Sequence, residues 1–244
     1  MNICSFFGLT LVILFSGIHS ATLTVKNNCP YTIWPATQTG GGAAQLSNTG
    51  FELASQASVS LDTPAPWNSG RLWARTQCSS DSSGRFTCAT ADCGSGQVAC
   101  NGAVGALPAS LSEFTLASNG GQDFYDVSLV DGFNLPVSIT PQGGSGENCT
   151  TTSCGVNINA NCPSDLVITG SNGSIIGCKS ACAAFNEPQY CCTGTYNSAD
   201  TCKATSYSMI FKNKCPQAYS YAFDDSSSTF SCTGSTNYLI TFCP

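Results

Sequence analysis

Cysteine is the residue type that most constrains this chain, because it occurs seventeen times in 244 residues. Residues 6–18 form an apolar run that ends at a boundary of small residues, a pattern typical of a secretory signal peptide. We therefore predict that residues 1–20 are a signal peptide and that residues 21–244 form one domain. Removal of this peptide takes away Cys4 and leaves sixteen cysteines, which predict up to eight disulfide bonds in an oxidising compartment.

The sixteen cysteines do not reveal their partners, because the number of pairings is very large. One constraint follows: adjacent Cys191 and Cys192 should bond to different partners, since a bridge between neighbours would be strained. A zinc site is the alternative for positions 88 and 93 and for 178 and 182, whose spacings are close to those of zinc fingers. Secretion favours disulfides there, and no calcium-binding loop is present, so we expect no metal site.

The single histidine, His19, also lies in the predicted signal peptide. A mature chain without histidine excludes a Ser-His-Asp triad, a Cys-His pair and a histidine zinc ligand. Acid–base chemistry would therefore depend on aspartate and glutamate. We expect no cofactor.

The chain is poorly charged, with 9% charged residues and a formal net charge of −6. Its basic residues gather only in pairs, such as Arg71 with Arg75 and Lys212 with Lys214. Nucleic acids and anionic membranes require larger basic clusters. We therefore expect no nucleic-acid partner and no strong binding to an anionic membrane.

Short runs with alternating apolar residues, separated by glycine, proline, asparagine and serine, predict a mainly β chain with a sandwich or barrel core. The expected strands are residues 21–26, 71–76, 124–130, 135–139, 166–169, 219–223 and 238–242. Eight of the sixteen cysteines fall between Cys149 and Cys202. This density predicts a separate disulfide-rich subdomain, with short helices at 179–185 and 204–211.

Carboxylates are concentrated in one segment: Glu113, Asp123, Asp126 and Asp131 lie within nineteen residues. In the expected strand 124–130, side chains alternate between two faces, so the apolar residues at 125, 127 and 129 share one face. Asp126 then points outwards or into a cleft. Asp131 has the opposite parity, but it begins a turn that can re-aim its side chain. These carboxylates could line one groove, or they could form a solvated surface.

Two further segments combine aromatic and charged residues. Residues 71–75 place Arg71, Trp73 and Arg75 on one face, which favours an arginine stacked on an indole. Residues 219–225 alternate aromatic residues and end in two aspartates. Aromatic rings beside carboxylates suit sugars, although alternating aromatic residues are more often core.

Residues 84–100 contain Gly-x-Phe-x-Cys-x-Thr-Ala-Asp-Cys, followed by a short glycine-containing loop and a further cysteine. This segment resembles the signature of the thaumatin family. Supporting segments occur at residues 27–34, 126–134, 189–192, 215–221 and 242–244. The resemblance is to the large acidic plant members, which belong to the pathogenesis-related proteins and include fruit allergens.

The resemblance implies a thaumatin-like β-sandwich core, a disulfide-rich subdomain and an acidic cleft between them. The pairing pattern of the family implies the bonds Cys29–Cys243, Cys78–Cys88, Cys93–Cys100, Cys149–Cys232, Cys154–Cys215, Cys162–Cys178, Cys182–Cys191 and Cys192–Cys202. The cleft residues of the family correspond to Arg71, Glu113, Asp126, Asp131 and Asp225. Similar members are antifungal, bind β-1,3-glucan and in some cases hydrolyse it weakly.

We therefore expect a monomeric defence protein that binds β-1,3-glucan or another cell-wall polysaccharide. Because the chain carries no carboxyl-terminal extension of the vacuolar type, we expect it to be extracellular, in the apoplast. Asn148 and Asn172 lie in glycosylation sequons, the first weakened by the cysteine in its middle.

Two other functions remain open. The first is a weak endo-β-1,3-glucanase, with Glu113 as general acid and Asp126 or Asp131 as base or nucleophile. The second is an inhibitor of proteases or amylases that uses an extended loop at residues 61–70.

Overall fold

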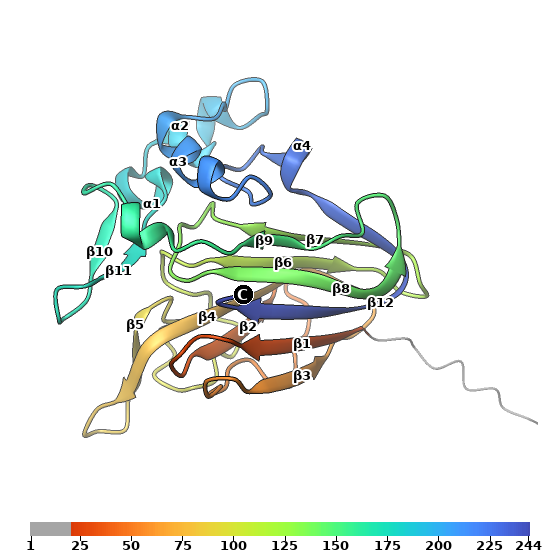
Figure 1. The fold of residues 1–244 in the computed structure, drawn as a ribbon, viewed down its shortest axis with the longest axis horizontal. Helices are drawn as coiled ribbons and strands as arrows, with labels where there is room; N and C mark the ends of the chain where they lie inside the picture. Colours follow the sequence, from red (N-terminus) through yellow and green to blue (C-terminus); the bar gives the residue numbers. More distant parts are fainter. Residues whose placement is uncertain (1–20) are drawn as a thin grey trace, which may run out of the picture.

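The computed structural model describes residues 21–244. The predicted signal peptide, with Cys4 and His19, lies outside the described residues. One ten-stranded sheet dominates the fold (Figure 1). Along its main path the strands follow the order β2 (Trp34–Thr39), β4 (Trp67–Ser80), β6 (Leu111–Leu116), β7 (Gln122–Ser128), β12 (Phe230–Phe242), β1 (Thr22–Asn27) and β3 (Ser58–Asp62).

Three further strands extend this sheet: β5 (Phe86–Thr90) pairs with β4, β8 (Val137–Ser145) with β12, and β9 (Thr152–Cys154) with β8. The long strand β12 connects the two halves of the sheet. Its first residues pair with β7, and its later ones pair with β8 and, in parallel, with β1. The prediction of a mainly β chain is confirmed.

Alternation along the strands places the core between the two halves of the curled sheet. Tyr125 and Val127 of β7 are 1% and 0% exposed, as the parity of that strand predicted. The ring of Tyr125 lies 5.1 Å from that of Tyr238 on β12, and Phe114 on β6 lies 5.4 Å from Tyr238. Trp67 on β4 stacks on Phe114 at 6.1 Å. These aromatic contacts join both halves of the sheet.

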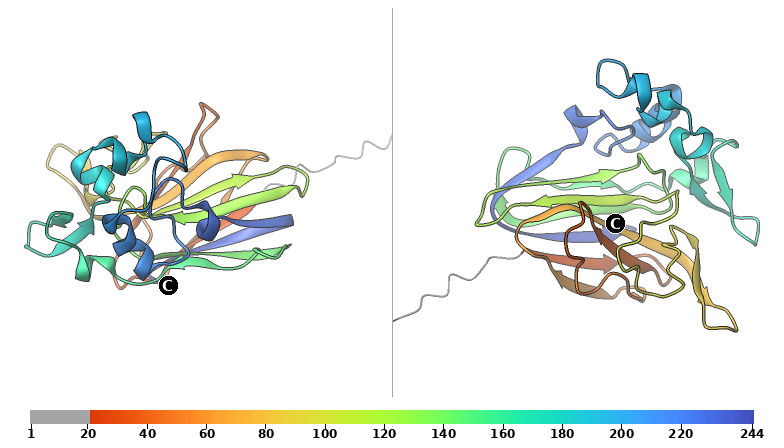
Figure 2. Two further views of the ribbon diagram at one scale, coloured as in Figure 1. Left: turned by 90° about the horizontal axis from the view of Figure 1, so that it is seen from above. Right: turned by 180° about the vertical axis from the view of Figure 1, so that it is seen from behind.

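The second region lies over one face of this sheet and contains all the helices of the described chain (Figures 1 and 2). Its elements are η1 (Ile158–Asn161), β10 (Val167–Thr169), β11 (Ile175–Cys178), α1 (Ala181–Phe185), α2 (Pro188–Cys191), η2 (Gly194–Tyr196), α3 (Ser206–Lys214) and α4 (Asp225–Ser228). The helices expected at 179–185 and 204–211 correspond to α1 and α3. No helix within residues 21–244 is long and apolar enough to cross a membrane.

Eight disulfide bonds join the sixteen cysteines of the described chain in the pairing that the resemblance implied. Cys191 and Cys192 bond to different partners, Cys182 and Cys202, as expected for neighbours. The bond between Cys29 and Cys243 closes a separation of 214 residues. In the entropic model such a long loop restricts the unfolded chain strongly.

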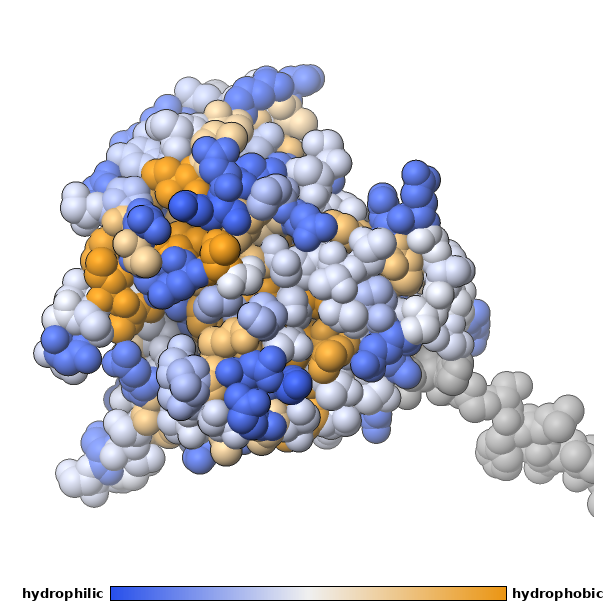
Figure 3. All heavy atoms as spheres, viewed as in Figure 1, coloured by the Kyte–Doolittle hydropathy of each residue, from blue (hydrophilic) through white to orange (hydrophobic). Residues whose placement is uncertain are grey.

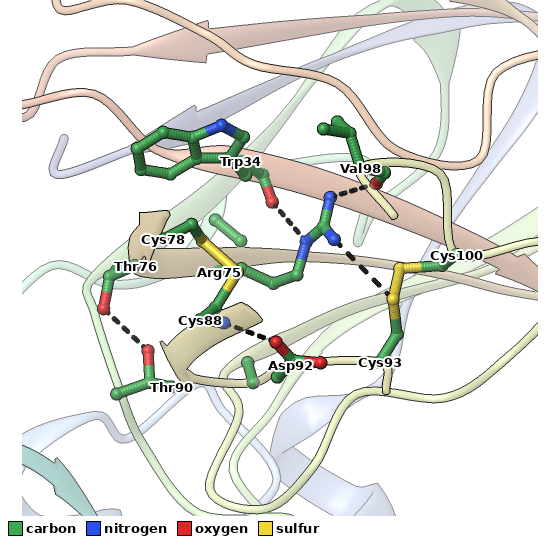
Figure 4. The surroundings of a disulfide bond; sticks show 12 residues. Trp34, Arg75, Thr76, Cys78, Cys88, Thr90, Asp92, Cys93, Val98 and Cys100 are labelled. Atoms are coloured by element: carbon green, nitrogen blue, oxygen red, sulfur yellow. Dashed lines mark hydrogen bonds between the residues drawn. A yellow bond between two sulfur atoms is a disulfide. The ribbon is translucent and has the colours of Figure 1, made fainter. Parts of the chain in front are cut away.

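Arg75 lies fully buried beside the Cys93–Cys100 bond (Figure 4). Its guanidinium donates to the main-chain oxygens of Trp34, at 3.1 Å, and Val98, at 2.6 Å, and to the sulfur of Cys93. Burial lowers the pKa of Arg75 to about 10, while the charge of nearby Asp92 opposes that shift.

The expected stacking of an arginine on an indole is wrong. Arg75 lies over the ring of Phe86, with its guanidinium carbon 5.4 Å from the ring centre. The indole of Trp73 is buried and donates to the main-chain oxygen of Ala91. Alternation along the strand predicted that Arg71, Trp73 and Arg75 share one face, but the aromatic ring that Arg75 contacts belongs to Phe86 on another strand, β5.

Two other expectations need correction. The strand expected at 219–223 is a turn, because Asp224 accepts hydrogen bonds from the main-chain N–H and the hydroxyl of Ser220. The extended loop expected at 61–70 is shorter than predicted, since β3 continues to Asp62 and β4 begins at Trp67. Trp67 is 1% exposed and its indole donates to Thr39, so it is not available to a protein target.

Candidate functional site

A cleft of about 630 Å³ opens on the face of the sheet that the second region covers. Strands β2, β4, β6 and β7 form its floor, and the segment around Tyr219 and α4 forms a wall. The structure brings all five expected cleft residues to its lining: Arg71, Glu113, Asp126, Asp131 and Asp225.

Four polar side chains form a row across the floor of the cleft. Gln38 on β2 lies opposite Arg71 on β4, Arg71 opposite Glu113 on β6, and Glu113 opposite Asp126 on β7. Directly opposite residues of antiparallel strands have Cβ atoms about 4.5 to 5.5 Å apart. Their sequence neighbours point to the core, so the alternation of four separate strands builds this polar row.

Arg71 and Glu113, the two central residues of the row, form an ion pair. The Nε atom of Arg71 lies 2.8 Å from the Oε1 atom of Glu113, and their side chains are 42% and 28% exposed. This ion pair holds the Glu113 carboxylate in place and engages its Oε1 atom within the protein.

Asp126, at one end of the row, has the opposite character. Its Oδ1 atom is buried and has no hydrogen-bond partner among residues 21–244. Burial raises the pKa of Asp126 well above its ordinary value, and the negative charges of Glu113 and Asp225 add to the shift while Arg71 opposes it. The carboxyl of Asp126 therefore holds a proton more strongly than an exposed aspartate does.

Gln38, at the other end, is a cleft residue that the sequence analysis missed. Its Oε1 atom is buried and has no hydrogen-bond partner within the described chain. Of the four side-chain atoms in this condition, two belong to the ends of this row. Alternation in residues 34–39 could have identified Gln38, but proline and small residues hide that strand.

The wall of the cleft depends on a contact between distant segments. The main-chain N–H of Tyr219 donates to Val127, and that of Leu129 donates to Tyr219, which fixes this segment along β7. The hydroxyl of Tyr219 donates to Oδ1 of Asp225, the first residue of α4, at 2.9 Å.

Asp131 reaches the cleft through the turn that follows β7. The next residue, Gly132, has a φ of +91°, and a Cβ atom there would lie 2.6 Å from the main-chain oxygen of Cys178. Only glycine fits this turn without strain. Burial raises the pKa of Asp131, and the charge of Arg71 opposes that shift.

Two carboxylates from the predicted clusters lie outside the cleft. Asp123 is 5% exposed and accepts hydrogen bonds from the hydroxyl of Tyr238, at 2.9 Å, and the N–H of Ala117, at 2.8 Å. Burial raises the pKa of Asp123, and these two hydrogen bonds oppose the shift. Asp224 closes the turn described above and forms an ion pair with Lys212 at 2.9 Å.

The remaining sequence candidates also lie away from the cleft lining. Asn148 and Asn172, the sequon residues, are both exposed. Within residues 21–244 there is no group of three or more histidine, cysteine, aspartate or glutamate side chains that could hold a metal ion.

Comparison with known proteins agrees with this fold. A sequence profile of the Thaumatin family matches residues 27–244. Thaumatin-like protein 1 from Pyrus pyrifolia is 64% identical over 239 residues, which cover 97% of each chain. Glucan endo-1,3-beta-glucosidase from Prunus avium is 62% identical over 237 residues, which cover 97% of this chain and 96% of the relative.

A solved structure of a laminaripentaose-producing beta-1,3-glucanase in complex with laminaritetraose has a TM-score of 0.60. The match covers 93% of this chain and 99% of that one, at 12% identity, and therefore shows a shared fold alone. The family profile and the two plant relatives carry the assignment, because they extend over almost the whole described chain. The chain belongs to the thaumatin family.

Proposed function

We propose that this chain is a secreted plant defence protein that binds the β-1,3-glucan of fungal cell walls in the acidic cleft. The observation that carries the proposal is the row of polar residues across the cleft floor. Its central ion pair fixes the geometry, whereas the Oδ1 atom of Asp126 and the Oε1 atom of Gln38, at its ends, have no hydrogen-bond partner within residues 21–244. Buried polar groups are normally hydrogen-bonded, so unpartnered ends favour a ligand with many hydroxyl groups.

The rim of the cleft adds apolar surface that suits a sugar ring. Phe124 on β7 is 43% exposed although it is large and apolar, and it lines the cleft together with Tyr219. The C–H face of a sugar ring can lie against such rings while its hydroxyls reach the carboxylates. Both kinds of contact are available to a neutral polysaccharide.

Binding is tested by retention of the oxidised protein on insoluble β-1,3-glucan. Asp126→Ala removes an acceptor at one end of the row and should weaken retention about tenfold, which corresponds to about 1.4 kcal/mol. Asp200→Ala is the matched control, since Asp200 is exposed and lies outside the cleft lining. Equal retention of parent and Asp126→Ala would contradict binding in this cleft.

Slow hydrolysis of the same glucan is the second function that we propose for this cleft. It is supported by the name of the Prunus avium relative and by the different surroundings of two adjacent carboxyls. Burial raises the pKa of Asp126, which favours its protonated form, whereas the carboxylate of Glu113 is paired with the guanidinium of Arg71. We therefore assign the acid to Asp126 and the base or nucleophile to Glu113, the reverse of the roles expected from the sequence.

The two assignments, with either Asp126 or Glu113 as the acid, predict different rates on substrates with different leaving groups. A dinitrophenyl glycoside of a β-1,3-linked glucose oligosaccharide needs no proton when its leaving group departs. Asp126→Asn should therefore release dinitrophenolate at nearly the parent rate but lose about 100-fold on unmodified soluble glucan. Glu113→Gln should lose activity on both substrates. If Asp126→Asn instead fails on both substrates while Glu113→Gln retains the activated one, Glu113 is the acid.

If the parent protein releases no reducing ends from β-1,3-glucan, the hydrolysis proposal fails and the protein binds the glucan without cleaving it. The remaining expectations are proposals of the same kind: cleavage of residues 1–20, export to the apoplast, and glycans at Asn148 and Asn172. Inhibition of foreign proteases or amylases ranks last, because its expected loop is shortened and Trp67 is buried.

A further inference from the structure

A second pocket, of about 390 Å³, lies away from the acidic cleft. It is bounded by the far end of β4, by η1, by β11 and by the segment near Cys243. Gln77 in this pocket lies six residues after Arg71 of the cleft along β4. At about 3.3 Å per residue, the two positions are about 20 Å apart. The pocket therefore cannot be an extension of the row that forms the cleft floor.

The lining of this pocket differs from that of the cleft, because it includes no aspartate, glutamate, lysine or arginine. Its rim carries two large side chains that are unusually exposed, Tyr31 at 48% and Ile175 at 42%. A third, Val156, is 44% exposed and precedes the lining residue Asn157. Hydrophobic side chains gather on the side of the molecule where β10 and β11 lie (Figure 3).

Asn159 provides an unsatisfied polar group in the lining. This residue is 8% exposed, and its Nδ2 atom donates to the main-chain oxygen of Asn134 at 3.0 Å. Its main-chain N–H donates to Asn157, and its main-chain oxygen accepts from Cys162. Its Oδ1 atom alone has no partner within the described chain. A buried acceptor of this kind needs a donor from water or from a ligand.

We propose that this pocket is a second saccharide-binding site, which takes neutral hexose residues. An ionised ligand would lose its hydration without meeting an opposite charge in the lining. A hexose places an apolar ring face against Tyr31 and Ile175, and one of its hydroxyls supplies the donor that Asn159 needs. The exposed amides of Gln77 and Asn157 offer further hydrogen bonds at the rim.

A peptide fits these observations less well. Peptides are usually held through main-chain pairing at a strand edge, through several apolar anchors in a groove, or through charged clusters. The pocket instead combines one aromatic ring with side-chain amides. This combination matches a ring that is rich in hydroxyl groups.

The test is a titration of the isotope-labelled, oxidised protein by nuclear magnetic resonance. The protein is first deglycosylated, because Asn172 in its sequon lies two residues from the lining residue Ser174. The probes are hexasaccharides of β-1,3-linked and of β-1,4-linked glucose. We expect saturable shifts of the side-chain signals of Gln77, Asn157 and Ile175, in the parent and equally in Asp126→Ala.

Tyr31→Ala should weaken binding at these signals roughly fivefold to tenfold, because it removes the ring. Tyr196→Ala is the matched control, since Tyr196 is also exposed, at 37%, and does not line the pocket. If neither hexasaccharide shifts the pocket signals, or if a neutral peptide of similar size does so instead, the proposal is overturned. Shifts confined to the cleft would overturn this second site and leave the proposed glucan binding in the cleft intact. Shifts confined to this pocket would support the second site and contradict glucan binding in the cleft.

Discussion

Two arginines four residues apart on β4 have opposite surroundings. Arg71 lies in the cleft, 42% exposed at its side chain, and pairs with the carboxylate of Glu113. Arg75 is fully buried and donates to two main-chain oxygens and a disulfide sulfur, and no carboxylate lies within ion-pair distance in the described chain (Figure 4). One arginine fixes a loop of the protein, and the other belongs to a row of polar residues whose two end residues each leave a buried oxygen without a hydrogen-bond partner in residues 21–244.

Two aspartates on β7 repeat this contrast. Asp123 is hydrogen-bonded through both carboxyl oxygens to Tyr238 and Ala117, whereas Asp126 has a buried oxygen that finds no hydrogen-bond partner in the part of the chain that the structure describes. Both carboxyls have a raised pKa because of burial, so the pKa alone does not separate them. What separates a structural from a binding role here is whether the protein itself satisfies the polar group.

The largest expected difference concerns the two arginines. Arg75→Ala should lower the free energy of unfolding by about 3 to 5 kcal/mol, because it opens a cavity at a fully buried position and leaves two partly buried carbonyls without donors. Arg71→Ala should cost less than about 1 kcal/mol, the usual range for a partly exposed ion pair. Urea unfolding of both variants with intact disulfides measures the difference. Equal losses would show that Arg71 is also a structural residue.

The aspartates should differ by a smaller amount. Asp123→Ala removes an acceptor from two buried donors and should cost about 1 to 3 kcal/mol. Asp126→Ala leaves the Oδ1 position, which has no hydrogen-bond partner among the described residues, without a buried polar atom, so its stability should equal or exceed that of the parent. The same urea experiment compares them, and a loss for Asp126→Ala as large as that for Asp123→Ala would remove the distinction.

The pH dependence of stability gives a separate check on Asp126. The pKa of Asp126 is higher in the folded than in the unfolded chain, so the folded state binds the proton more strongly. Proton binding therefore stabilises the folded state at low pH. This contribution to the free energy of unfolding is lost as the pH rises above the pKa of the unfolded chain. Asp126→Asn carries no such group. The free energy of unfolding of Asp126→Asn should equal that of the parent near pH 3 and exceed it by on the order of 1 kcal/mol at neutral pH.

Thermal unfolding of the parent and Asp126→Asn across this pH range measures this difference. Asp200→Asn is the control with the same chemical change at an exposed position. A constant difference between parent and Asp126→Asn at all pH values would contradict the raised pKa.

The smallest effect is expected at Gln38. Because its amide oxygen has no hydrogen-bond partner in the described part of the chain, Gln38→Ala should change the free energy of unfolding by less than about 0.5 kcal/mol. Retention on insoluble β-1,3-glucan should nevertheless fall roughly threefold to tenfold, if the amide binds the ligand. Unchanged retention would limit the binding row to Arg71, Glu113 and Asp126.

Much of the fold could be predicted from local pattern. Alternation located the strands around Arg71 and Asp126, and the turn at Asp131 explained how a residue of the wrong parity reaches the cleft. The same reasoning failed at residues 219–223, where Asp224 closes a turn through Ser220. That hydrogen bond competes with strand pairing, and the aromatic alternation gives no sign of it.

The sequence could predict which residues line the cleft, but not the contacts that those residues make. Glu113 was expected to be the acid because glutamate has the higher ordinary pKa. The register between β4 and β6 decides which carboxyl forms an ion pair with the guanidinium of Arg71. In this register Arg71 lies opposite Glu113 and pairs with it. Gln38 was missed for the same reason, since its place in the row depends on the pairing of β2 with β4.

The sequence by itself determined the oxidised character of the chain, its mainly β class and the family that its motifs resemble. These properties depend on composition, local alternation and spacing, which are written along the chain. Only the tertiary structure decided which arginine is buried, which aspartate has a buried oxygen without a partner among residues 21–244, and that a second, uncharged pocket lies beyond the cleft. Hydrogen-bond satisfaction and burial depend on residues far apart in the sequence, and only folding brings those residues together.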